Sequence, residues 1–190
     1  MGWMDAFETL TSLSQYGAYE EDRLEDACLL GGSSQKEISS PHYSLEHIPE
    51  ITRAKKSGGE IRLLKTVLTS ACERNCNYCC FRAGRDFRRA TLKPVEMARV
   101  FHQLQIAGIA EGLFLSSGVA GGGVRTQDRL IDAAEILRNN YQYRGYLHLK
   151  IMPGAEKDQV LRAMRLASRV SINLEAPNPQ RLEALAPRKT

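Results

Sequence analysis

Hydrophobic and polar positions follow a repeated strand–helix pattern over the last two thirds of the chain. Short apolar runs predict strands at residues 63–69, 112–117, 146–152 and 170–175. After each run, apolar residues recur at helical spacing, which predicts helices that begin near Pro94, Thr126, Glu156 and Asn178. The residues predicted to face the core are Met97, Val100, Phe101 and Leu104, then Leu130, Ala133, Ala134 and Leu137, then Val160, Leu161 and Met164.

Strands that alternate with helices in units of about 30 residues are typical of a parallel sheet with crossover helices. A complete eight-unit barrel takes about 250 residues, roughly twice the length that follows residue 61. We therefore predict an α/β fold, a partial (β/α) barrel truncated after about four βα units. The predicted domain organisation is an N-terminal helical or irregular extension at 1–60 and a core at 61–190.

The first sixty residues lack this strand–helix rhythm. Phe7, Leu10 and Leu13 have helical spacing and predict a short helix over 5–13. Further helices are predicted over 20–30, which contains Cys28, and over 45–55. We expect Cys28 to be a small buried side chain.

Composition excludes several classes of protein. Hydrophobic residues make up 43% and charged residues 25% of the chain, as in ordinary globular proteins. The net charge of +4 is too small to indicate a nucleic-acid partner by itself. No apolar run reaches the 18 residues of a membrane-spanning helix, and the N-terminus lacks a signal-peptide core. The sequence predicts a cytoplasmic protein.

Three of the five cysteines lie together directly after the first predicted core strand. Cys72, Cys76 and Cys79 form a C-x3-C-x2-C motif. Three thiolates at this spacing can hold three irons of a [4Fe-4S] cluster and leave the fourth iron without a protein ligand. The alternative is a structural zinc site, which needs four ligands, usually in two close pairs. Cys80 is adjacent to Cys79, and we expect it to pack rather than to ligate.

The cysteine spacing, its place after the first strand and the βα repeats resemble the radical S-adenosylmethionine (SAM) superfamily. The resemblance covers about residues 61–190 and implies a partial barrel of the radical SAM type. More specifically, residues 64–71, 79–91, 112–118, 148–154 and 171–177 resemble a radical SAM family assigned to DNA modification or repair. Members of that family are predicted to carry a DNA-binding helix–hairpin–helix after the barrel, a module that this sequence lacks.

The resemblance implies an enzyme whose cofactors are a [4Fe-4S] cluster and SAM. The reduced cluster cleaves SAM, and the resulting 5′-deoxyadenosyl radical abstracts hydrogen from a substrate. An electron donor such as flavodoxin or ferredoxin is also implied. The cluster ligands would be Cys72, Cys76 and Cys79. The residues implied to contact SAM are Tyr78 near the adenine, Ser116, Ser117 and Gly118 near the amino group, and Asn173 and Glu175 near the ribose.

Two positions in this region allow other interpretations. His148 and Lys150 share a face of one predicted strand. Lys150 could bind the SAM carboxylate or an anionic substrate group, or these residues could form an ion pair with Glu175 on the next strand. Ser116 and Ser117 could belong to a polar turn, and the run of glycines at 121–123 is most simply a flexible loop.

Four arginines beside the cysteines suggest a nucleic-acid contact. Arg82, Arg85, Arg88 and Arg89 are interleaved with Phe81 and Phe87, a combination suited to phosphates and bases. One or two of these arginines could instead fix the cysteine loop or bind the SAM carboxylate. The sequence therefore predicts action on DNA, with two alternatives: a radical SAM enzyme for a protein or small-molecule substrate, and an inactive truncated fragment.

Overall fold

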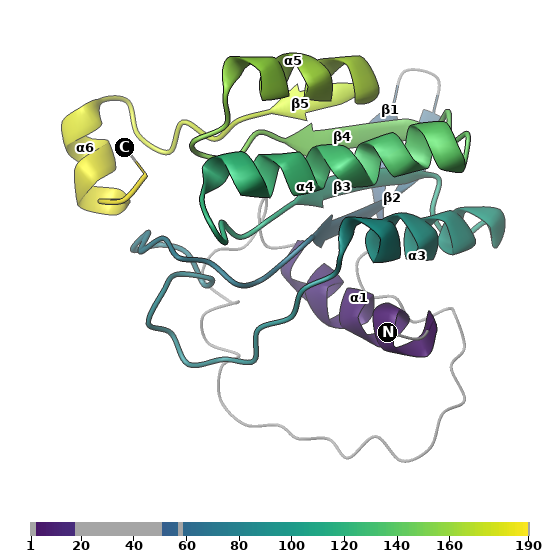
Figure 1. Cartoon of the computed structure of the whole chain (residues 1–190), viewed down its shortest axis with the longest axis horizontal. Coiled ribbons are helices and arrows are strands. Elements are labelled where there is room, and N and C mark those ends of the chain that lie inside the picture. Colours follow the sequence, from purple (N-terminus) through teal and green to yellow (C-terminus); the bar gives the residue numbers. More distant parts are fainter. Residues whose placement is uncertain (1–2, 18–50, 57–58, 190) are drawn as a thin grey trace.

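A five-stranded sheet forms the centre of the protein (Figure 1). The computed structural model describes residues 3–17, 51–56 and 59–189. The strands lie in the order β1-β2-β3-β4-β5, and β2 to β5 are parallel, whereas β1 is antiparallel to β2. Their bounds are β1 Ile51–Lys56, β2 Gly59–Val67, β3 Gly112–Ser116, β4 Tyr146–Lys150 and β5 Arg169–Ser171.

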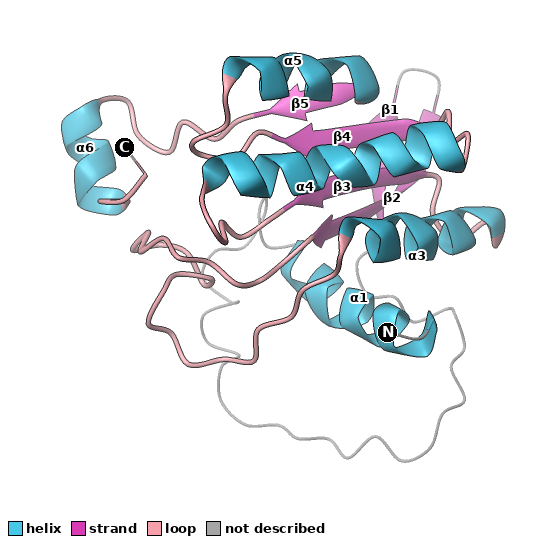
Figure 2. Cartoon of the chain, in the orientation of Figure 1, coloured by secondary structure: helices cyan, strands magenta, loops and turns pink. Residues whose placement is uncertain are grey.

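Three helices cover one face of this sheet and connect its parallel strands (Figures 1 and 2). They are α3 Pro94–Ile106, α4 Gly123–Glu135 and α5 Lys157–Leu166. A π-helical turn, η3 Ile136–Asn140, extends α4. The predicted α/β fold with a parallel sheet and crossover helices is confirmed.

The core lies between the sheet and these helices. Leu113, Leu115, Leu147 and Leu149 of the central strands are fully buried. Because side chains alternate along a strand, these leucines share the face that the helices cover. The predicted inward residues of α3 and α4 are also buried, which confirms the helical periodicity of both. These are Met97, Val100, Phe101 and Leu104, and Leu130, Ala133, Ala134 and Leu137.

The opposite face of the sheet carries a mixture of polar, basic and apolar side chains. Lys65, Phe114, His148 and Arg169 are register partners across β2 to β5, so they form one row on this face. Towards the carboxyl ends of the strands, the next row contains Ser116, Lys150 and Ser171. Lys65 and His148 have interaction partners within the protein.

The described parts of the N-terminal region pack against the core. The predicted first helix is confirmed as α1 Trp3–Gly17, whose Phe7, Leu10 and Leu13 are buried against β2 and α3. The helix predicted over 45–55 is wrong, because residues 51–56 form β1 and pair with β2. The predicted helix over 20–30 and Cys28 lie outside the described residues. The division into 1–60 and 61–190 stays a prediction.

Helix α5 differs in part from the prediction. Val160 packs against the core as predicted, but Leu161 and Met164 are 43% and 56% exposed, and Gln159 and Ala163 are buried. The Gln159 side-chain amide donates to the carbonyl of Val124 and to the carboxylate of Asp128 on α4, so a polar contact holds this residue at the interface.

Several element boundaries differ from the sequence prediction. Strand β2 covers Gly59–Val67 instead of 63–69, β4 ends at Lys150 instead of 152, and β5 covers Arg169–Ser171 instead of 170–175. Helix α4 begins three residues before Thr126, at Gly123, with Gly122 as its N-cap. Thr126 instead donates its hydroxyl to the carbonyl of Gly122, at 2.7 Å. The predicted Asn178 cap and Pro179 start of α6 Pro179–Leu185 are confirmed.

Within the described residues, no helix is both long enough and apolar enough to span a bilayer.

We expect the substitution Leu149→Ala to lower the free energy of unfolding by about 2 to 5 kcal/mol, because it leaves a cavity beneath α4. Leu161→Ala on the exposed side of α5 is the matched control and should change stability by less than about 0.5 kcal/mol. Denaturant unfolding followed by circular dichroism measures both. Equal losses in the two variants would contradict the described position of α5.

Candidate active site

A long loop between β2 and α3, residues 68–93, carries the three motif cysteines at the carboxyl end of the sheet (Figure 2). Its two ends are fastened to each other. The amide of Leu92 donates to Leu68, the amide of Ser70 donates to Ala90, and the hydroxyls of Thr69 and Thr91 lie 2.6 Å apart. Residues 72–79 therefore project from a closed base at the edge where parallel barrels place their sites.

Arg89 fixes the middle of this loop. Its guanidinium donates to the carbonyls of Ser70 and Phe81 at 2.7 Å, of Arg82 at 3.0 Å and of Arg85 at 3.3 Å. It also stacks over the ring of Phe87, at 3.7 Å from the centroid. This arginine is thus engaged in the loop, as the alternative interpretation of the basic cluster allowed, and is not available for a phosphate.

Glu73 links the cysteine loop to the start of α4. Its carboxylate accepts hydrogen bonds from the amides of Gly121, at 3.0 Å, and Gly122, at 3.2 Å. Both glycines have left-handed backbones, with φ of 78° and 90°, so their amides point at one anion. The glycine run was predicted as a flexible loop. Two of its backbone amides instead bind the carboxylate of Glu73, which lies within the cysteine motif.

Gly118 at the end of β3 contacts the residue before Cys72. A Cβ at position 118 would lie 2.3 Å from the carbonyl oxygen of Ala71, and the Gly118 amide donates to Thr69 at 2.7 Å. Only glycine permits this approach. The strand end and the first cysteine are therefore held side by side through their backbones.

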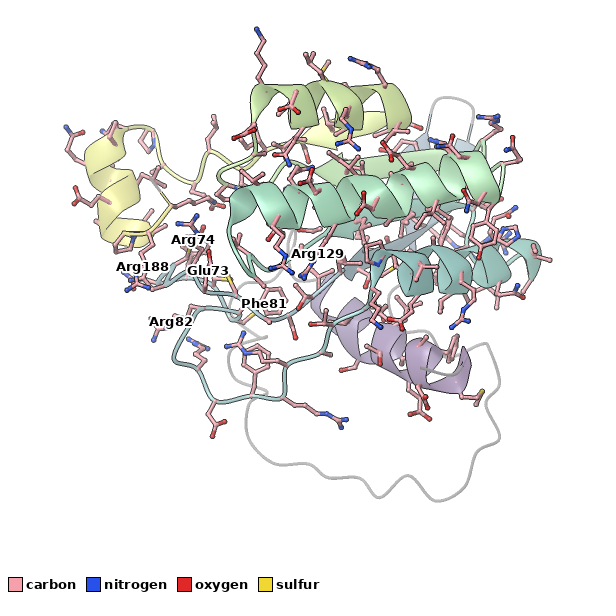
Figure 3. All side chains as sticks on the ribbon, viewed as in Figure 1. Glu73, Arg74, Phe81, Arg82, Arg129 and Arg188 are labelled. Atoms are coloured by element: carbon pink, nitrogen blue, oxygen red, sulfur yellow. The ribbon has the colours of Figure 1, made fainter. Side chains whose placement is uncertain are left out.

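Helix α6 and the residues after it lie against the cysteine loop (Figure 1). Asn77 donates its backbone amide to Leu185, at 2.8 Å, and its side-chain amide to Ala184, at 2.9 Å. The guanidinium of Arg74 donates to the carbonyl of Arg188, and Figure 3 shows these two residues close together. Elements about 110 positions apart in the sequence thus form one wall.

Together these segments enclose a cavity of about 530 Å³, a volume typical of small-molecule and cofactor sites. All ten residues predicted to hold the cluster or SAM line it: Cys72, Cys76, Cys79, Tyr78, Ser116, Ser117, Gly118, Lys150, Asn173 and Glu175. The four arginines of the basic cluster lie outside the lining. Cys80 also lines the cavity and, as expected, packs against the core.

Sequence reasoning missed three groups of lining residues. Arg74 lies within the cysteine motif, and this position could have indicated that it lines the cavity. Ile151 and Met152 follow β4 directly, as parallel-sheet sites often do. Lys189 gave no sequence signal, because it lies after the last periodic element and reaches the cavity only through the fold.

A hydrogen-bonded network joins the polar residues of the cavity. The ammonium of Lys189 lies 2.6 Å from the carboxylate of Glu175 and 3.4 Å from the hydroxyl of Tyr78. Lys150 donates to the side-chain oxygen of Asn173. The predicted alternative of an ion pair between Glu175 and residues of β4 is wrong, since Glu175 pairs with Lys189 and His148 contacts Ser171 at 2.8 Å.

This network shifts the pKa of its members. Burial raises the pKa of Glu175, but hydrogen bonds from Lys189, Tyr78 and Asn173 and the charge of Lys189 outweigh burial and lower the pKa below its usual range. Burial and the neighbouring Glu175 charge raise the pKa of Tyr78, so its hydroxyl stays protonated. Burial, followed by the charge of Cys79, raises the pKa of the Cys76 thiol.

The donor set fits a cluster better than a single ion. A structural zinc site brings four ligands to one point. In the described part of the chain, no three Cys, His, Asp or Glu side chains are placed to hold one metal ion. Each cysteine of a cluster binds a separate iron. Cys72, Cys76 and Cys79 line one cavity and could supply the three ligands of a [4Fe-4S] cluster with one open iron.

A comparison with known protein families identifies the superfamily of this chain. Residues 66–190 match the model of the radical SAM superfamily. The chain belongs to the radical SAM superfamily. The cofactors of this superfamily are a [4Fe-4S] cluster and SAM.

The fold agrees with that membership. The crystal structure of HydG, a maturase of the [FeFe]-hydrogenase, is similar to this chain with a TM-score of 0.51 at 18% sequence identity. The similarity covers 64% of this chain and 27% of HydG, so the radical SAM chain spans about a quarter of that protein. No curated protein matches this sequence significantly.

We expect Arg89→Met to lower the free energy of unfolding by about 1 to 3 kcal/mol, because it leaves loop carbonyls without their donor. Amide hydrogen exchange across residues 70–92 should accelerate. Arg88→Met is the matched control, since Arg88 is exposed, and should leave both measurements unchanged. Equal exchange in the two variants would show that the loop does not depend on Arg89.

Proposed function

We propose that Cys72, Cys76 and Cys79 ligate a [4Fe-4S] cluster and that the adjoining cavity binds SAM. The observation that carries this assignment is that all three cysteines line one cavity with the ends of β3 and β4 and with residues 172–175. The cluster, when bound and reduced, supplies the electron that cleaves SAM to a 5′-deoxyadenosyl radical. Three cysteine ligands would leave the fourth iron of such a cluster open for the amino and carboxylate groups of SAM.

The cavity residues have separate tasks in this proposal. Ser116, Ser117 and Gly118 present polar groups to the amino group of SAM, and Lys150 offers a cation to its carboxylate. Tyr78 lies along the adenine, whereas Asn173 and Glu175 accept from the ribose hydroxyls. The apolar lining, which includes Val119, Ile151 and Met152, keeps water away from the radical.

Cluster assembly tests the ligand assignment. Anaerobic reconstitution of the wild-type chain should give about four irons and four sulfides per chain. Alanine at Cys72, Cys76 or Cys79 should abolish the cluster absorbance and the electron paramagnetic resonance (EPR) signal. Cys80→Ala is the matched control, because Cys80 lines the same cavity but is expected to pack. A wild-type chain that loads zinc with full occupancy and no iron would contradict the assignment.

We propose DNA as the substrate. Arg82, Arg85 and Arg88 lie on the same loop as Arg89; Arg85 has an interaction partner within the protein, whereas Arg88 is exposed. Figure 3 shows Arg82 on the outer side of that loop, away from the sheet. The strand face opposite the helices also carries Lys65 and Arg169, with no acid among its described strand residues. Basic side chains on the cysteine loop and on this strand face favour a phosphate-bearing substrate.

DNA binding tests this choice of substrate. Fluorescence anisotropy over a series of salt concentrations should show affinity that falls steeply with salt. Arg88→Ala should reduce the slope of log affinity against log salt by roughly one. Arg144→Ala, at an exposed position after η3, should leave the slope unchanged. Salt-independent or absent binding would favour a protein or small-molecule substrate, and a loaded cluster that never releases 5′-deoxyadenosine would favour an inactive fragment.

A further inference from the structure

Lys189 reaches the cofactor cavity from beyond α6, and no established role requires it there. Its side chain is 13% exposed, and that of its partner Glu175 is 16% exposed. The ammonium and carboxylate lie 2.6 Å apart, which is hydrogen-bond distance. Because both charges are largely removed from water, separating them would leave a poorly solvated carboxylate at the cavity wall.

Glu175 holds an unfavourable backbone conformation at this point. Its φ of 63° is left-handed, a region that non-glycine residues seldom adopt. Such a conformation persists when surrounding contacts determine it, and these conformations cluster at functional sites. Here the contact is the hydrogen bond that the carboxylate accepts from Lys189, at 2.6 Å. The chain thus turns at Glu175 and directs its side chain into the network.

The same ammonium also reaches the cysteine loop. Lys189 donates to the hydroxyl of Tyr78 at 3.4 Å. On the adjoining wall, Lys150 of β4 donates to the side chain of Asn173. The tail after α6 is therefore linked through Lys189 both to Glu175 and to the cysteine loop. Networks of this kind fix side-chain positions collectively.

We propose that Lys189 is a positioning residue for SAM: its ammonium holds Glu175 and Tyr78 in the orientation that receives the nucleoside half of SAM. This inference rests on the proposed function, because it takes the cavity as the SAM site. Lys189 acts through its partners and need not touch SAM. Loss of its charge leaves the Glu175 carboxylate to turn towards water and frees the Tyr78 ring.

Direct measurement of SAM binding tests the proposal. Wild type, Lys189→Met, Lys189→Arg and Arg188→Ala are reconstituted anaerobically, and iron and sulfide are determined for each. SAM affinity is then measured by calorimetry, and EPR spectra of the reduced cluster are recorded with and without SAM. Arg188 is the matched control, because only its backbone carbonyl contacts the cysteine loop.

The expected result is equal iron content in all four proteins. Lys189→Met should bind SAM about tenfold more weakly, the factor expected for one lost charge-assisted hydrogen bond. Its EPR spectrum should respond less to SAM at the same SAM concentration. Lys189→Arg should retain affinity within about threefold, since it keeps the charge and can still donate to the carboxylate. Arg188→Ala should match the wild type.

Several outcomes overturn the proposal. If wild type loads a cluster and binds SAM, and Lys189→Met binds it equally well, Lys189 does not position the site. If wild type loads no cluster or does not bind SAM, the proposed function itself fails. If Lys189→Met does not load iron, the SAM affinities of Lys189→Arg and Glu175→Gln decide the question. Wild-type affinity in Lys189→Arg together with weaker SAM binding in Glu175→Gln supports the proposal. Wild-type affinity in both variants contradicts it.

Discussion

The hydrogen bonds of one guanidinium group organise the loop on which the site depends. The chain between β2 and α3 is long and irregular, so its backbone carbonyls have no regular partners within a helix or sheet. Buried carbonyls without donors are costly. Arg89 supplies donors to four of them and stacks on Phe87. A planar side chain with five N–H groups suits this task, which a single lysine ammonium could not reproduce.

Two more interactions orient the cysteine motif after Arg89 has shaped its loop. Glu73 is held by the amides of Gly121 and Gly122, which tie the motif to the start of α4. Gly118 brings the end of β3 into backbone contact with Ala71. The cysteines are thereby placed relative to the strand ends by backbone geometry.

Periodicity predicted the parts of this protein whose burial is complete. Strands β3 and β4 and helices α3 and α4 lie at the centre, where most inward positions are apolar, so those residues were identified from the sequence, whereas the buried Gln127 of α4 was not. The cysteine spacing likewise located the cavity. Prediction failed where few neighbours constrain the chain: β5 lies at the sheet edge and is shorter than predicted, and α5 exposes Leu161 and Met164. Residues 51–56 became a strand because β2 offered an edge, a partner that local sequence does not reveal.

The loop conformation that places the cysteines also affects their electronic environment. The amide of Phe81 points at the sulfur of Cys79, at 3.4 Å. Its neighbours are fixed, because the Phe81 carbonyl accepts from Arg89. Hydrogen bonds to cluster sulfurs help to set the reduction potential, and they favour the more negatively charged, reduced state. In a cluster held by Cys79, the guanidinium that shapes the loop would thus also hold an amide towards a ligand sulfur. Structural support of the loop and tuning of the cluster would then depend on the same residue, although Arg89 contacts no cysteine sulfur itself.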